Sequence, residues 1–130
     1  MAALLPPGWP RPRGYANGVS AQGRMVFVAG MIGWDADGRF AEGGIAAQAR
    51  QALANVVAVL AAGDARPEHI VRMTWYVTDR KAYIAAAREI GAAYREIIGS
   101  YDVAMTAVAV SALVEDRALV EIEATAVVPE

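Results

Sequence analysis

Apolar and polar side chains alternate along Ala104–Val128, and this pattern indicates two β-strands joined by a charged turn at Glu115-Asp116-Arg117. Successive side chains of a strand point to opposite faces of a sheet. In the second strand one face is entirely apolar and carries Val120, Ile122, Ala124, Ala126 and Val128. The other face carries Leu119, Glu121, Glu123 and Thr125. The pattern therefore predicts a sheet with one apolar face that needs a cover and one mixed face with two carboxylates.

Two segments have the spacing of amphipathic helices. The stretch Ile45–Ala62 places apolar residues on one stripe and is followed by Gly63, a residue that often ends helices. A second stripe runs from about Lys81 to Ile98 and stops at Gly99. These two helices are predicted to cover the apolar face of the sheet.

Three further strands are expected. A short one at Tyr15–Ser20 and a buried one at Met25–Gly30 are predicted to form a hairpin, and Ile70–Thr78 is rich in β-branched and aromatic residues. The proline-rich segment Met1–Gly14 is expected to be an extended arm that Trp9 holds against the body. The sequence thus predicts one domain over residues 1–130, an α+β two-layer sandwich in which two helices cover one face of a mixed sheet.

Composition narrows the function classes. The chain of 130 residues has a net charge of −2 and no basic cluster, so nucleic-acid binding is not expected. It contains no Cys and one His, so neither thiol chemistry nor a multi-histidine metal site is expected. No apolar run of about 20 residues and no signal peptide are recognised, which favours a cytoplasmic protein without membrane contact. A hydrophobic content of 56% suggests burial between subunits.

Five motifs in order and spacing resemble the reactive intermediate deaminase family, also called RidA/YjgF. They span nearly the whole chain and are Tyr15–Val19, Val26–Gly30, Ala47–Val56, Ile70–Asp79 and Val120–Ala124. The resemblance implies a chorismate-mutase-like fold and a homotrimer with a central β-barrel and ligand clefts between subunits. It also implies hydrolysis of small enamines and imines without a metal or cofactor.

The resemblance assigns site residues position by position. Tyr15 matches the site tyrosine, Gly30 the glycine whose backbone faces the ligand, and Glu121 the acid that orients the attacking water. Three positions depart from the family: Met105 replaces the substrate-binding Arg, Ala107 a Cys, and Ala29 the Ser before the glycine. Because an Arg pairs with a carboxylate through two hydrogen bonds, its loss is expected to disfavour small 2-imino acids and to favour a ligand that is neutral or more apolar at that place.

Each of these residues also has a structural interpretation. Glu121 could pair with an Arg across a subunit boundary, Tyr15 could be an ordinary edge aromatic residue, and Met105 could belong to the core. Asp35–Gly38 is interpreted as a turn and not as a calcium loop, since the later ligands are missing.

Three functions follow from these observations. The leading one is binding, with hydrolytic deamination, of a small imine, enamine or related metabolite. The alternative is a non-enzymatic ligand-binding or interaction module on the same scaffold. Ribonuclease activity, attributed to some relatives, is disfavoured by the acidic balance.

Overall fold

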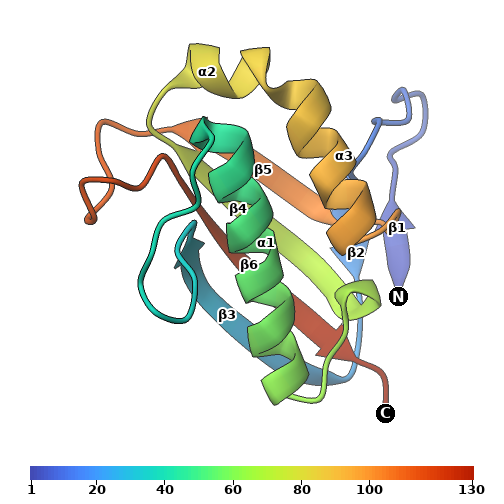
Figure 1. Cartoon of the computed structure of the whole chain (residues 1–130). Helices are drawn as coiled ribbons and strands as arrows, with labels where there is room; N and C mark the ends of the chain where they lie inside the picture. Colours follow the sequence, from blue (N-terminus) through green and yellow to red (C-terminus); the bar gives the residue numbers. More distant parts are fainter.

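The computed structural model describes all residues, 1–130, and contains six strands and three α-helices. In chain order they are β1 (Ala2–Leu4), β2 (Gly18–Ser20), β3 (Arg24–Ile32), α1 (Gly44–Ala62), β4 (Ile70–Val77), α2 (Arg80–Ala85), α3 (Ala87–Ile97), β5 (Ala104–Ala109) and β6 (Val120–Val128). Figure 1 shows the helices on one side of a twisted sheet. The predicted α+β two-layer architecture is confirmed.

The main sheet has the strand order β3-β6-β4-β5. β6 pairs antiparallel with both β3 and β4, whereas β4 and β5 are parallel. Parallel strands require a crossover, and the segment with α2 and α3 makes the one between β4 and β5 (Figure 1). β1 and β2 form a separate two-stranded sheet.

The core forms where α1 and α3 meet the apolar face of the sheet. In β6 the residues Val120, Ile122, Ala124 and Ala126 are buried and alternate with half-buried residues, as the sequence pattern predicts. Trp75 from β4 and Leu53 from α1 are among the largest fully buried side chains. The opposite face of the sheet is covered by neither helix (Figure 1) and carries polar side chains together with exposed Met25 and Phe27.

One predicted strand pairing is wrong. The strand expected at Tyr15–Ser20 is only β2, and it pairs with β1 and not with β3. Gly23 lies against the end of β6, where a Cβ would come within 2.2 Å of the Val128 carbonyl oxygen. β3 therefore pairs with β6, a partner of equal length whose apolar positions match its own. β5 and β6 follow one another in the chain but are not neighbours in the sheet, because β4 lies between them.

The predicted helix from Lys81 to Ile98 is interrupted at Ala86. Tyr83 and Tyr94 both contact Trp75, with ring centroids 6.3 and 6.4 Å from the indole. In a straight helix their Cα atoms would be about 16 Å apart along the axis. The change of direction between α2 and α3 (Figure 1) lets both rings contact one indole.

The N-terminal arm is fixed differently from the prediction. Trp9 is exposed, and the backbone pairing of β1 with β2 holds the arm instead. The indole of Trp9 was the expected anchor, but main-chain hydrogen bonds between β1 and β2 hold the arm.

The longest helix, α1, would satisfy a length and composition test for a membrane span. Seven of its residues are buried inside the protein, including Leu53, Val56 and Leu60. A helix in the core of a domain passes the same test, so this finding is weak evidence for a membrane segment. Its C-terminal end is capped by Arg24, whose guanidinium donates to the carbonyl oxygens of Gly63 and Asp64 at 2.8 and 3.1 Å.

Candidate functional site

A cavity of about 470 Å³ lies beside the edge strand β5, between the N-terminal segment and α3. We call it the edge cavity, and its principal walls are Tyr15, Trp75, Tyr83, Tyr94, Tyr101 and Met105. Four of the five tyrosines of the chain line it. Its size and its apolar and aromatic walls are those of a site for a small molecule.

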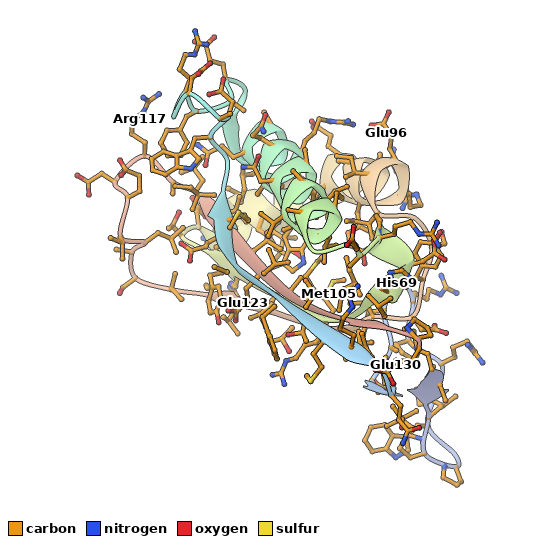
Figure 2. The ribbon with its side chains drawn as sticks, turned by 90° about the horizontal axis from the view of Figure 1, so that it is seen from below. His69, Glu96, Met105, Arg117, Glu123 and Glu130 are labelled. Carbon is orange, nitrogen blue, oxygen red and sulfur yellow. The ribbon has the colours of Figure 1, made fainter.

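Backbone pairing brings Tyr15 to Met105. The N–H of Ala16 donates to the Val103 carbonyl oxygen at 2.8 Å, and Ala16 forms a parallel bridge with Ala104. Met105 lies in register with Met73 of β4, a buried core residue, so its side chain is on the helix side of the sheet (Figure 2). Met105 both packs against the core and lines the edge cavity. The two interpretations from sequence, core residue and cavity wall, therefore both describe it.

Two polar atoms in the walls have no partner in the protein. They are Trp75 Nε1 and the Tyr94 hydroxyl, both buried. Burial raises the pKa of Tyr94 to about 12 and also raises the pKa of Tyr83. The Tyr94 hydroxyl therefore keeps its proton at neutral pH.

Glu121 and Gly30 lie together on neighbouring strands. A Cβ at position 30 would come within 2.1 Å of Glu121 Oε2, so only glycine leaves room for the carboxylate there. Glu121 is half-buried and has neither a hydrogen bond nor an ion pair within the chain. Since a partly buried carboxylate requires a donor, this acid is available to a water molecule, a ligand or another subunit.

Glu123, two residues further along β6, already has a partner. Its carboxylate accepts a hydrogen bond of 2.7 Å from the Tyr76 hydroxyl, and this bond is the main cause that raises the Tyr76 pKa. Glu123 lies toward the uncovered side of the sheet, away from the helices (Figure 2). Its environment is that of a structural residue.

The predicted site residues fall into separate groups. Tyr15 and Met105 line the edge cavity beside β5, whereas Glu121 lies two strands away on β6 and Gly30 three strands away on β3, about 10 and 14 Å by the usual strand spacing. Ala29 lines a hollow on the uncovered face near Phe27 and Glu123. Ala107 pairs with Trp75 in the sheet register and lines neither space. One protomer therefore holds two parts of the predicted site and does not join them.

The turn predicted at Asp35–Gly38 is explained by local structure. Asp35 accepts hydrogen bonds from the backbone N–H groups of Asp37 and Arg39, which lowers its pKa and forms the predicted turn. Trp34 contacts Phe40 at a centroid distance of 5.5 Å across this loop. No group of three or more His, Asp or Glu side chains is arranged to hold a metal ion.

Sequence reasoning missed part of the edge cavity. Arg11, Arg95 and Asp102 also line it, and they come from segments that the motifs do not include. A signal was present in Gly91, because glycine inside a helix costs about 1 kcal/mol relative to alanine and suggests a local reason.

The fold and these two groups define a two-layer α+β protein with a small-molecule cavity at a sheet edge. The chain belongs to the RidA/YjgF family: the family model described as Endoribonuclease L-PSP matches residues 10–128. A RutC family protein of Pyrococcus horikoshii is 36% identical over 119 residues, with 90% of each chain covered.

Comparison with solved structures leads to the same family. The chain is similar to YyfB of Yersinia pestis, described as a protein of unknown function of the conserved Rid family, with a TM-score of 0.83, 34% identity and 98% of each chain covered. It is also similar to TdcF of E. coli with bound serine, with a TM-score of 0.70 and 28% identity, covering 98% of this chain and 99% of TdcF.

Proposed function

We propose that the protein binds a small imine, enamine or related metabolite between the subunits of a homotrimer and deaminates it by hydrolysis. The observation that carries this proposal is the Glu121 carboxylate, half-buried over Gly30 and without a partner in the chain. The serine bound in TdcF supports a ligand of amino-acid size in this family.

In the proposed reaction Glu121 accepts a proton from a water molecule, whose oxygen attacks the imine carbon. The nitrogen is then protonated, the C–N bond breaks, and ammonia leaves while a carbonyl group forms. One imine and one water thus give one carbonyl compound and one ammonia. This chemistry needs an acid, a water and hydrogen-bond donors, all of which protein groups supply.

The homotrimer would join the two parts of the site. Tyr15 and Met105 of one subunit would face Gly30 and Glu121 of its neighbour. The uncovered face of the sheet supports assembly, since Met25 and Phe27 are 56% and 68% exposed there. Contiguous exposed apolar side chains on one face of a sheet often mark a contact surface for another protein.

Small 2-imino acids are expected to be poor substrates, because Met105 cannot pair with a carboxylate as the family's Arg does. A charge-assisted hydrogen bond contributes about 1.5 to 3 kcal/mol, or roughly 10- to 100-fold in rate or affinity. Imines generated in place by an amino-acid oxidase should therefore decay little faster with the protein than in buffer. Decay as fast as with an active family deaminase would contradict this interpretation of Met105.

Met105→Arg is the matching prediction. An Arg at the start of β5 would restore the two hydrogen bonds, and kcat/KM for small 2-imino acids should rise at least about tenfold. Because Met105 also contacts the core, the melting temperature should fall by a few degrees. Unchanged activity in a folded variant would count against a carboxylate site at this position.

The alternative function is a ligand-binding module without hydrolysis. Met105, Ala107 and Ala29, three departures from the family pattern, favour it. Glu121→Gln separates the two functions on whichever imine is turned over. Loss of turnover with retained binding in Glu121→Gln supports hydrolysis, whereas ligand binding by the wild type with no imine turned over faster than in buffer supports the alternative.

A further inference from the structure

The edge cavity contains the guanidinium of Arg95, which approaches from α3. The family's Arg, replaced here by Met105, would approach from β5. Arg95 Nη1 lies 3.2 Å from the position that a Cβ of Gly91 would take, and both residues line the cavity. The guanidinium thus lies back along α3 over the glycine. Arg95 forms no ion pair with an acidic side chain, whereas Glu96 beside it pairs with Arg50.

The charges around the cavity favour an anion. Arg11 and Arg95 line it with a single carboxylate, Asp102, and neither arginine forms an ion pair with it. Arg95 belongs to the helix layer, whereas Met105 belongs to the sheet layer. An anionic group bound by Arg95 would therefore be held from α3, whereas the family's Arg holds a carboxylate from the position of Met105 in β5.

The interior between these charges is aromatic. Tyr83 and Tyr94 contact Trp75 within 6.4 Å, and Trp75 is 2% exposed. The indole Nε1 and the Tyr94 hydroxyl are the two buried atoms without partners. A flat apolar ligand would contact the aromatic side chains that line the cavity.

We infer that the edge cavity selects an imine or enamine with an aromatic or similarly flat apolar body and an anionic group remote from the imino carbon, bound by Arg95. This inference rests on the proposed function, because it takes the edge cavity as part of the ligand site. Met105 alone suggests a neutral or more apolar ligand. With Arg95 in the cavity, the inferred ligand is longer and carries one negative charge.

Stable acids that cannot be hydrolysed test the inference by titration calorimetry on the full chain. The probes are 3-phenylpropionate, its uncharged analogue 3-phenylpropionamide, and propionate, which lacks the ring. We expect 3-phenylpropionate to bind at least about tenfold more tightly than either of the others. Equal binding of acid and amide, or no binding of the acid up to about 10 mM, overturns the inference.

A pair of variants on one helix locates the cation. Arg95→Gln should weaken binding of the acid about tenfold and leave the amide unchanged, whereas Arg88→Gln, an exposed arginine of α3 outside the cavity, should change neither. Retained preference for the acid in Arg95→Gln, or an equal loss in Arg88→Gln, overturns the assignment to Arg95.

Measurements of binding and of hydrolysis test the inference and the proposed function separately. Acid binding with no turnover of any imine contradicts the deaminase proposal and supports this inference. Turnover of imines without preference for the aromatic acids contradicts this inference and leaves the proposed function in place.

Discussion

Gly30 determines where the Glu121 carboxylate can lie. A Cβ at position 30 would be 2.1 Å from Oε2 and 2.9 Å from Cγ, so Gly30→Ala must turn the carboxylate away. Turnover should then fall to the level of Glu121→Ala. The free energy of unfolding should change by no more than about 1 kcal/mol, because a flexible side chain can move and alanine suits a strand better than glycine. Steady-state kinetics and urea unfolding measure the two effects.

The double variant provides the control. If Gly30 acts through Glu121, adding Gly30→Ala to Glu121→Ala should cause no further loss of turnover. A further loss would mean that the glycine backbone contributes on its own, as a ligand contact.

Tyr94 gives stability a pH dependence of known sign. Its folded pKa of about 12 is above the value near 10 of an unfolded chain, so the unfolded state loses the proton first. The stability is fully present below about pH 10 and declines as pH rises toward 12, by at most about 1.4 kcal/mol per pH unit. Tyr94→Phe should reduce this decline and, by removing an unpaired hydroxyl, keep or raise stability at pH 7.

Urea unfolding at pH 8 and pH 11 measures this effect. Burial also raises the pKa of Tyr83, so the variant should retain part of the decline. An equal decline in wild type and Tyr94→Phe would show that Tyr94 titrates alike in both states.

At the scale of elements, α1 is joined to the segment before β6 by one amide group. Gln48 Nε2 donates to the Arg117 carbonyl oxygen at 3.0 Å, and Gln48 Oε1 accepts from the Leu119 N–H at 2.8 Å. Gln48→Ala removes both bonds and leaves backbone groups unpaired, so we expect a loss of about 2 to 3 kcal/mol in urea unfolding. Arg50→Ala is the control on the same helix, because its exposed pair with Glu96 contributes about 1 kcal/mol or less. Similar losses in both variants would contradict the role of Gln48.

The local sequence predicts the helices and strands themselves more accurately than it predicts the pairing of the strands. Alternation in β6 and helical spacing in α1 are properties of neighbouring residues, and both were read correctly. Pairing depends on segments far apart in the chain, so the insertion of β6 between β3 and β4 had no local signal. The bend at Ala86 was missed for the same reason, since the contact that explains it is Trp75 on another element.

At the scale of the whole molecule, the site also depends on contacts between segments far apart in the chain, which the local sequence does not show. Motif matching identified Tyr15, Gly30, Met105 and Glu121, and a physical reason for Gly30 beside Glu121 is visible in one protomer. The motifs did not include Arg95, because its place in the cavity depends on how α3 lies over β4 and β5. One protomer does not bring Glu121 to Met105, because β4 lies between their strands.

Phe27→Glu tests the assembly. Phe27 lies on the uncovered face, 68% exposed, and a carboxylate there would oppose burial against another subunit. Analytical ultracentrifugation should give three times the chain mass for the wild type and the chain mass for the variant. Ile84→Glu is the control, since Ile84 is 61% exposed but belongs to α2 in the helix layer, and it should remain trimeric. If the site lies between subunits, folded Phe27→Glu monomers should also lose imine turnover. A monomeric wild type, or an active monomeric variant, would contradict the proposed intersubunit site.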